Sequence, residues 1–458
     1  PYSNKTFRNS MSWARGKLTK KTLFNSSGAQ VSQTSISYTN LASQTTNIGQ
    51  SGSQWIVGRW GGFRYSPCSG HPQGIDVDGK ELIMWNLAKT TGNYKESSRT
   101  ETFNFGTSST STTTNKSYNA AYLLPVYEET LASSNPEVIR NTIRYPFDIV
   151  NTSGNYSGPP DVLKQMLLKN MFAYPVEQYT WIKPTSPSSL QIVGGQVTEF
   201  EQISGTTYYQ PKRSYFLEVP SLGSAYSPVT LSGTSTLTKD SRYKLRLTID
   251  SYDIRGNVLQ YTLEDGMTKS FIYAHEGSQV IAEADNSPGT SFAFTSFETN
   301  EKGGWSYSGP ESLVFTGEAK TGRKVYLLNN GDITKVYKGA YKLTLWVRKN
   351  TSSSSSLNIN GVSYSSLVDN SWKLIEVFGS GGTITISGSN TIVDELRVHS
   401  TAGMVKSYAV IPGIGIQSVI DAKNYGTFYF YDRMGRLETV KNEEGHILNH
   451  YEYIYIKP

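Results

Sequence analysis

Few residues of this 458-residue chain have the types and spacing that chemistry requires. His446 and His450 have the i, i+4 spacing of two metal ligands on one helix face, but they lie in a strand–turn–strand pattern, where they would not share a face. Carboxylate pairs such as Glu443 and Glu444 lie in turn sequences, where solvated charge is the ordinary role. No Gly-x-Ser-x-Gly elbow, phosphate-binding loop or catalytic cysteine motif occurs. The sequence therefore predicts a protein that is not an enzyme.

Aromatic side chains offer a second kind of chemistry, because an exposed ring face can stack on a sugar ring. Trp346 and Trp372 lie inside strong strand patterns, which favours positions in a core. Trp305 and Tyr307 stand beside glycines where a loop meets a strand. Trp305 and Tyr307 are therefore predicted as ligand-binding residues, with a glycan as the ligand.

The composition restricts the class of protein. Hydrophobic residues make up 37% of the chain and aromatic residues 12%, with 31 tyrosines against 7 methionines. This balance suits sheets with a wet face, because tyrosine packs its ring and keeps its hydroxyl hydrated. No apolar run approaches the roughly 18 residues that a membrane-spanning helix needs. The net charge of +6 is scattered, and the cluster of Lys17, Lys20 and Lys21 has no interleaved aromatic residues, so no nucleic-acid partner is expected.

The single cysteine, Cys68, excludes an internal disulfide framework and a zinc site made of several cysteines. The chain starts at Pro1 without a basic segment followed by an apolar one. We therefore expect a fragment or a processed product of a longer protein, whose signal peptide would lie outside this sequence.

One phrase recurs along the chain. Tyr431-Asp-Arg-Met-Gly-Arg-Leu aligns without a gap with Tyr252-Asp-Ile-Arg-Gly-Asn-Val, and looser copies occupy residues 24–31 and 405–431. Both phrases are joined to runs that alternate aromatic or β-branched residues with polar ones, a pattern that predicts antiparallel strands. The glycine supplies the positive φ of a tight turn. A recurring unit of roughly 20 residues predicts stacked hairpins that share one sheet.

The middle of the chain departs from this pattern. Asp161 opens a segment with apolar residues at helical spacing, and Lys169 near its end suits the helix dipole, so we predict one short helix at 161–171. Residues 137–143, which follow Pro136, suggest a further helical turn. The Ser/Thr tract at 107–115 suggests a flexible hairpin tip.

From residue 289 the pattern changes again, and alternating runs over about 105 residues predict a self-sufficient β-sandwich. The repeat phrases stop before this segment and resume after it, so we expect an insertion whose two ends lie close together. The predicted fold class is mainly β. The predicted domains are 1–288, a hairpin sheet with a short helix; 289–403, an inserted jelly-roll sandwich; and 404–458, repeats that complete the first sheet.

The Tyr-Asp-x-x-Gly-x-Leu phrase resembles the YD repeat of Rhs-type proteins. Met11-Ser-Trp-Ala-Arg-Gly-Lys-Leu, Pro412-Gly-Ile-Gly-Ile-Gln-Ser-Val-Ile-Asp and the tyrosine-rich ending resemble the C-terminal region of Bacteroidota-type secreted Rhs-like surface proteins. The resemblance implies a partly open shell or barrel of hairpins at the cell surface. It also implies export by the type 9 secretion route and docking on an outer-membrane protein complex for secretion or gliding motility.

The predicted sandwich resembles the jelly-roll carbohydrate-binding modules. The resemblance rests on Phe297-Glu298 near the start, the strand Tyr341-Lys-Leu-Thr-Leu-Trp-Val and the closing Ile392-Val-Asp-Glu-Leu-Arg-Val. In such modules a structural calcium ion often joins the first and last strands through oxygen ligands. By this resemblance, Glu298 and Asp394 occupy the ligand positions of a structural calcium ion.

Together these features predict a non-enzymatic, secreted or cell-surface scaffold or binding protein with a protein partner at the outer membrane. One alternative is a glycan-binding adhesin that acts through the jelly roll. Another is a toxin-carrying Rhs shell. Toxin-carrying members end their shell with a self-cleavage segment that contains Asp-Pro, and this sequence has no Asp-Pro, which counts against the third interpretation.

Overall fold

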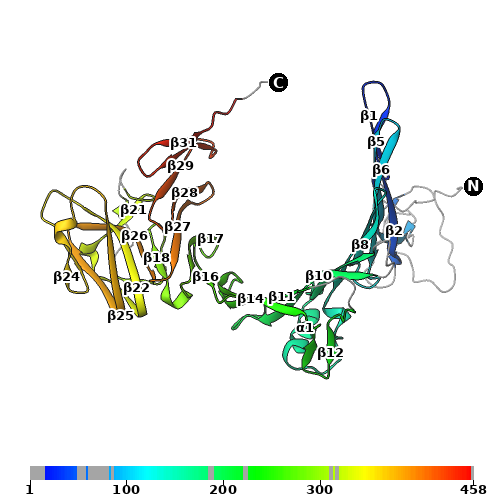
Figure 1. Ribbon diagram of the computed structural model, residues 1–458, viewed down its shortest axis with the longest axis horizontal. Helices are drawn as coiled ribbons and strands as arrows, with labels where there is room; N and C mark the ends of the chain where they lie inside the picture. The colour runs from blue at the N-terminus through cyan, green and yellow to red at the C-terminus, as the bar shows by residue number, and fades with distance from the viewer. Residues whose placement is uncertain are drawn as a thin grey trace, which may run out of the picture. The chain divides into compact units, whose positions relative to one another are not determined.

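The computed structural model describes residues 16–48, 58–59, 82–83, 87–183, 190–219, 225–308, 313–314 and 319–454. Most of these residues lie in antiparallel strands and a single α-helix occurs among them, which confirms the predicted mainly β fold class. The chain forms two compact units (Figure 1). Unit 1 comprises Pro1–Val197 and Phe216–Tyr243, and unit 2 comprises Thr198–Tyr215 and Lys244–Pro458.

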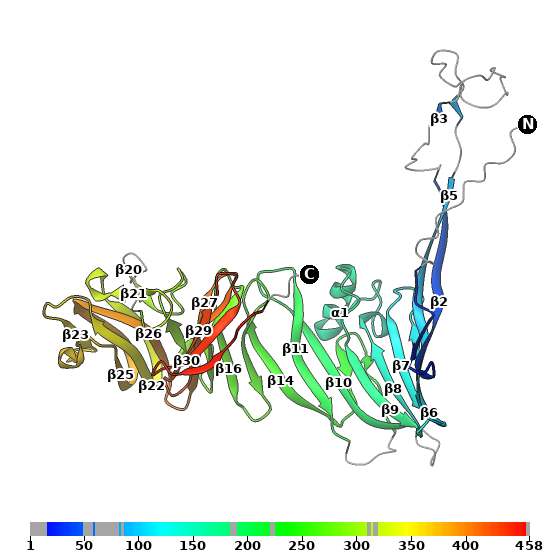
Figure 2. The same ribbon diagram turned by 90° about the horizontal axis from the view of Figure 1, so that it is seen from above.

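Unit 1 is built on an antiparallel ladder in which neighbouring strands follow one another along the chain (Figure 2). Its strands are β1 (Lys20–Phe24), β2 (Gln30–Ile48), β5 (Leu87–Phe105), β6 (Ser108–Tyr118), β7 (Pro125–Ala132), β8 (Asn135–Arg144), β9 (Glu177–Lys183) and β10 (Gln191–Gln202). Two further pairs stand apart: β3 (Gly58–Arg59) with β4 (Leu82–Ile83), and β12 (Thr230–Ser232) with β13 (Thr236–Thr238). The strand β11 (Tyr209–Leu217) follows β10 in the sequence.

The predicted helix is present, but it starts and ends earlier than expected. α1 spans Gly158–Leu168 rather than 161–171. Its first turn holds Pro159 and Pro160, because an N–H in the first turn has no partner inside the helix and its loss costs little. The helix ends before Asn170, which has a φ of 60° that no helical residue adopts. Among the described residues, no helix is long and apolar enough to cross a membrane.

Two further predictions for this region are wrong. Residues 137–143 lie in β8, which pairs with β7 on one side and β9 on the other. Most of the Ser/Thr tract at 107–115 lies in β6, which pairs with both β5 and β7. Threonine is β-branched and suits a pleated surface, so neighbouring strands order a tract that has little hydrophobic content of its own.

Unit 2 contains a second antiparallel ladder, interrupted in the sequence by the sandwich. It runs through β14 (Tyr243–Tyr252), β15 (Val258–Leu263), β16 (Thr268–Ala274) and β17 (Gln279–Asp285) and continues with β27 (Met404–Ile411), β28 (Gly415–Ile420), β29 (Gly426–Tyr431), β30 (Leu437–Asn442) and β31 (Ile447–His450). β17 pairs with β27 from Ala282↔Ser407 to Asp285↔Met404. The strands that flank the sandwich in the sequence are therefore neighbours in one sheet. The described pairings do not close this sheet on itself.

The recurring phrase forms the same turn wherever the structure describes it. The Asp432 carboxylate accepts hydrogen bonds from the backbone N–H groups of Met434 (2.8 Å) and Arg436 (3.0 Å), and Gly435 has a φ of 75°. Only a residue without a Cβ adopts this φ without strain. In the same way, a backbone N–H group four residues later donates to the side-chain oxygen of Asn25, Asp253, Asp421 and Asn442.

The tyrosine of each phrase ties its strand to the preceding one. The Tyr431 hydroxyl of β29 donates to the carbonyl oxygen of Ile416 in β28 at 2.7 Å. Equivalent bonds run from Tyr252 to Pro211, from Tyr273 to Val258 and from Tyr453 to Leu437. These four tyrosines therefore each hold a strand to an earlier strand of the chain.

The sandwich lies between β17 and β27. Its strands are β18 (Ala293–Thr295), β19 (Ser306–Tyr307), β20 (Leu313–Val314), β21 (Lys324–Leu327), β22 (Ile333–Lys349), β23 (Ser356–Ile359), β24 (Val362–Ser363), β25 (Lys373–Ser389) and β26 (Thr391–Ser400). Its two ends are in contact: Ser400 donates its backbone N–H to the Ser287 hydroxyl at 3.0 Å and its own hydroxyl to the Asn286 carbonyl at 2.6 Å. The predicted limits at 288 and 403 stay predictions.

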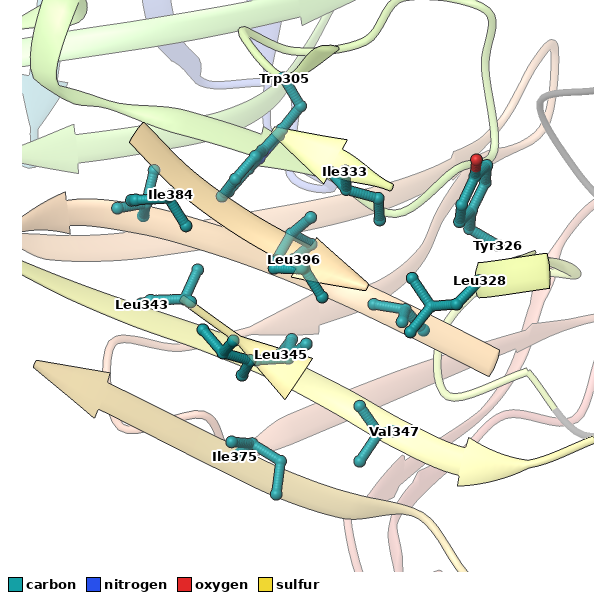
Figure 3. Close-up of a cluster of buried hydrophobic side chains, with 14 of the residues drawn as sticks. Trp305, Tyr326, Leu328, Ile333, Leu343, Leu345, Val347, Ile375, Ile384 and Leu396 are labelled. Carbon is teal, nitrogen blue, oxygen red and sulfur yellow. The ribbon is translucent and has the colours of Figure 1, made fainter. Parts of the chain in front are cut away.

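The sandwich core is a cluster of aliphatic and aromatic side chains, and hydroxyls of its tyrosines reach backbone carbonyl oxygens, as Tyr326 does with Ser308 and Tyr337 with Ser291. Figure 3 shows Leu343, Leu345 and Val347 from alternate positions of β22 beside side chains of other strands. These three residues are fully buried, whereas the intervening Trp346 is partly exposed. The alternation is the one expected for a strand with one face in a core. Because burial of each such side chain contributes about 1.5–3 kcal/mol, this cluster is the main source of stability of the sandwich.

Candidate functional site

Trp305 and Tyr307 lie in the sandwich core, with 4% and 5% of their surface exposed. The Tyr307 ring lies 5.7 Å from that of Phe297 and 5.1 Å from that of Tyr326, centroid to centroid. A sugar cannot stack on a ring that the core encloses. The placement therefore gives the predicted glycan contact no support, and that contact stays a prediction.

The neighbouring glycines explain this placement. A Cβ on Gly303 would lie 1.6 Å from the carbonyl oxygen of Phe294, so the glycine permits two backbone segments to approach closely. In the sequence alone, the same glycines suggest a loop beside the strand. Trp346, interpreted as a core residue, is partly exposed, and the Lys320 ammonium lies 3.7 Å from the centroid of its ring.

The predicted calcium ligands lie beside one short segment, Thr321–Lys324. Glu298 accepts backbone hydrogen bonds from Arg323 (2.7 Å) and Lys324 (2.5 Å). A Cβ on Gly322 would lie 2.3 Å from the Glu298 carboxyl carbon, so only glycine lets the carboxylate lie against this backbone. Asp394 is completely buried and accepts the backbone N–H of Thr321 at 2.9 Å.

A β-bulge brings a further carboxylate to the same place. Thr344 and Trp346 of β22 face Arg397 and Asp394 of β26, so two residues of β26 oppose one of β22. Glu395 has a φ of 49° in this bulge, and its carboxylate accepts the Thr321 hydroxyl at 2.8 Å. Consecutive residues of a regular strand point to opposite faces, so the bulge is what allows Asp394 and Glu395 to contact the same threonine.

The oxygen atoms of this carboxylate cluster (Glu298, Asp394 and Glu395) are of the type that calcium prefers. However, in the described part of the chain no group of three or more His, Cys, Asp or Glu side chains is arranged to hold a metal ion. The carboxylates accept N–H and O–H groups of the protein instead. The calcium ion stays a prediction.

The stability of unit 2 is expected to depend on pH through Asp394. Burial and the neighbouring Glu395 carboxylate raise the pKa of Asp394 well above 3.8. The folded state then binds this proton more tightly than the unfolded state, so the stabilisation is full below the ordinary pKa and is lost as the pH rises through the raised one. We expect the unfolding temperature of unit 2 to rise as the pH falls toward the raised pKa.

Thermal unfolding of the whole chain at a series of pH values measures this dependence. The Asp394→Asn variant should show a flatter profile, because the amide has no proton to exchange in this range. Asp369→Asn is the matched control, since Asp369 is exposed and hydrogen bonds from Ser371 lower its pKa. Equal pH profiles for the wild type and Asp394→Asn would contradict the expectation.

Next to the carboxylate cluster, a buried arginine joins the sandwich to the hairpin sheet. Arg397 of β26 is 2% exposed, and its guanidinium makes an ion pair with Glu395 at 3.1 Å. Its terminal nitrogens also donate to atoms of the segment 405–424, at Val405 O (3.4 Å), Ser407 Oγ (2.7 Å), Ile420 O (3.4 Å), Asp421 O (3.0 Å) and Asn424 Oδ1 (3.3 Å). One sandwich side chain is thus bonded to β27, to β28 and to the turn after it.

Apolar packing supports the same junction. Phe292 and Phe294 of the sandwich are buried with small residues of the hairpin sheet in one cluster: Ala274, Ile281, Ala282, Ala284 and Val405. At the other side, Lys320 makes an ion pair with Glu443. The sandwich and the hairpin sheet of unit 2 are therefore joined by hydrogen bonds, by an ion pair and by apolar packing.

Unit 1 has a buried charge of its own at Glu177, which is completely buried. Its carboxylate accepts from the Arg144 guanidinium (2.8 Å), the Tyr226 hydroxyl (2.5 Å) and the backbone N–H of Val229 (2.9 Å). Burial raises the pKa of Tyr226, and the bond to Glu177 raises it further. These bonds attach the segment 226–229 to the strands β8 and β9.

Sequence reasoning missed both Arg397 and Glu177. A signal existed for Arg397, because Asp, Glu and Arg interrupt the otherwise apolar run Ile392-Val-Asp-Glu-Leu-Arg-Val that closes the sandwich. Charged residues in such a run are buried only when paired. Glu177 starts an ordinary alternating strand, and nothing in the local sequence distinguishes it from an exposed glutamate.

No protein-family model matches the chain, and no curated protein matches it. The matching solved structures include the CBM22-1 xylan-binding domain of Xyn10C from Paenibacillus barcinonensis, at 15% identity and a TM-score of 0.18. That match covers 23% of this chain and 91% of the domain.

A second match is TcdB2-TccC3 without its hypervariable C-terminal region, at 11% identity and a TM-score of 0.19, covering 95% of this chain and 24% of that one. A third is the Tc holotoxin pore of Photorhabdus luminescens, at 8% identity and a TM-score of 0.14. This chain spans 21% of the length of the holotoxin chain. At these TM-scores the likenesses carry no argument about function.

Proposed function

We propose that this chain is a non-enzymatic scaffold that binds another protein by adding a strand of the partner to the open edge of its hairpin sheet. The observation that carries the proposal is the last strand of the ladder, β31. It pairs with β30 and with no other described strand. Its outer edge therefore presents backbone N–H and C=O groups that can pair with an extended polypeptide.

The residues of β31 do not protect this edge. Ile447 is 62% exposed and Leu448 is 53% exposed, and no charged residue lies between Ile447 and His450. By contrast, β1 at the start of the unit 1 ladder carries the exposed Lys20 and Lys21. Lysine on an edge strand is a common protection against unwanted pairing. The apolar, uncharged edge of β31 is the type that a partner strand would cover.

The bonded junction between sandwich and hairpins supports the role of a scaffold. The Arg397 bonds hold the sandwich against β27 and β28. A partner bound at β31 would therefore be held in a fixed position relative to the sandwich. Residence at the cell surface and a partner in an outer-membrane secretion or gliding complex belong to the same proposal, and they rest on the sequence resemblance.

A single backbone N–H group offers a sharp test. The N–H of Tyr451 points toward β30, because it donates to the Glu438 carbonyl at 2.9 Å. Successive N–H groups of a strand alternate, so that of His450 points outward. His450→Pro removes this donor while it spares the bonds to β30. Affinity purification from the native envelope should recover at least tenfold less partner with His450→Pro than with the wild type.

The matched control is His450→Ala, which also loses the imidazole but keeps the N–H. It should recover the partner as the wild type does, and hydrogen exchange of the bound chain should slow at residues 448 and 450. Equal recovery with His450→Pro and His450→Ala would show that the edge is not used.

A further inference from the structure

A groove of about 560 Å³ lies on the sheet of unit 1, over the strands β7 to β10. The register of β8, β9 and β10 places the polar side chains of the groove on one face of the sheet. Asn141 of β8 faces Thr180 of β9, which faces Gly194 of β10, and in the next row Gln178 faces Gln196. Rows two residues apart share a face of a sheet. The opposite face carries Glu177 and its partners.

Most of the amide donors and acceptors in this groove have no partner among the described residues. The Thr180 hydroxyl donates to the Asn141 carbonyl oxygen at 2.7 Å, which turns the Asn141 NH₂ group away from it. The side chains of Gln178 and Gln196 make no hydrogen bond to any described residue. Asn141 and Gln178 are exposed, so three amides can offer donors and acceptors to a ligand.

The groove also has an aromatic wall and an open floor. Phe216 lines it with 44% of its surface exposed. A Cβ on Gly194 would meet no atom within 4 Å, so the space above this residue is empty. Gly194 does not have a left-handed φ, and the backbone there would accept a larger residue. The glycine thus leaves room in the groove rather than permitting a special turn.

The chemistry of the lining defines the ligand. The backbone of β9 is already paired on both sides, so no peptide strand can be added there and recognition must come from side chains. The single carboxylate in the groove, Glu128, is paired with Lys116 at 3.6 Å. An amide presents a donor beside an acceptor, as two adjacent sugar hydroxyls do, and an exposed ring stacks on the C–H face of a pyranose.

We propose that this groove binds a neutral oligosaccharide, with Asn141, Gln178 and Gln196 as hydrogen-bonding residues and Phe216 as the stacking ring. This amide groove is separate from the sandwich, from the carboxylate cluster and from the edge of β31. It gives unit 1 a binding activity of its own.

Calorimetric titration of the full chain tests the proposal, with cello-, xylo- and manno-oligosaccharides as neutral probes and oligogalacturonate as an acidic one. At least one neutral probe should bind, and oligogalacturonate should bind at least tenfold more weakly. Gly194→Leu fills the groove and should abolish binding. Phe216→Ala should weaken it about tenfold. Phe103→Ala, which removes a ring of similar exposure (47%) from β5, should leave the affinity unchanged.

Thermal unfolding shows whether each variant is folded. If Gly194→Leu does not fold, the double variant Gln178→Ala/Gln196→Ala makes the same test, because it shortens two partly or fully exposed side chains. The proposal is wrong if no neutral probe binds at millimolar concentration, if the acidic probe binds best, or if filling the groove leaves the affinity intact.

Discussion

Replacement of Arg397 by methionine is expected to lower the free energy of unfolding of unit 2 by about 3–5 kcal/mol. The variant leaves the buried carboxylate of Glu395 without its cationic partner. It also removes the guanidinium donor from the Ser407 hydroxyl and from the Asp421 carbonyl oxygen, which keeps only the Asn424 N–H at 3.1 Å. An uncompensated buried charge is among the most destabilising consequences of a single substitution. Denaturant unfolding of the wild type and the variant measures the difference.

Two further variants show whether the charge is the cause. Arg433→Ala removes an exposed arginine from a turn of the same unit and should change the stability by less than about 0.5 kcal/mol. The double variant Glu395→Gln/Arg397→Met removes both members of the ion pair. Its loss of unfolding free energy should be about 1–3 kcal/mol smaller than the sum of the losses in the two single variants. Strict additivity would argue against a paired buried charge.

Replacement of Glu177 by leucine is expected to lower the free energy of unfolding of unit 1 by about 3–5 kcal/mol. Leucine has a similar volume, so the loss of unfolding free energy comes from the groups that bond to the Glu177 carboxylate. The Arg144 guanidinium would lose its counter-charge, and the Tyr226 hydroxyl and the Val229 N–H would lose their acceptor in a buried place. Because these bonds hold segment 226–229, its amide hydrogens should exchange faster as well.

Glu101→Ala supplies the comparison. Glu101 lies in β5 of the same unit, is 44% exposed on its side chain and has Arg99 at 3.7 Å as its ionic partner. Exposed pairs of this kind contribute about 0–1 kcal/mol. If Glu177→Leu costs no more than Glu101→Ala, the Glu177 network does not stabilise the unit.

The turns were the most predictable part of the fold. A Tyr-Asp-x-x-Gly phrase specifies both the side-chain acceptor and the residue with positive φ, so a few residues define the conformation of the hairpin. The looser copy at residues 405–431 folds in the same way: Asp421 accepts the Tyr425 N–H at 2.9 Å, and Asn424 with a φ of 66° stands where the others have glycine. Asparagine tolerates this conformation better than other residues with a Cβ.

Burial within the sandwich was not predictable in the same way. Trp305, next to two glycines, was expected to be accessible and is buried. Trp346, inside a strand, was expected in the core and is partly exposed. Local sequence does not reveal which face of a strand another segment covers. Glu298 and Asp394, which the resemblance predicts as calcium ligands, lie beside the same backbone segment, and the calcium ion stays a prediction. The bulge that adds Glu395 depends on pairing between β22 and β26, which no single segment encodes.

The contact between Ser400 and the pair Asn286 and Ser287 bears on how such a chain could be rearranged by recombination. An inserted module with adjoining ends can be cut out with no change in strand order, and β17 and β27 would then become an ordinary hairpin. The alanines of β17 argue against such an excision, because Phe292 and Phe294 are what cover them. We expect a shortened chain to expose these apolar residues and to be prone to aggregation, which favours retention of the module together with its host sheet.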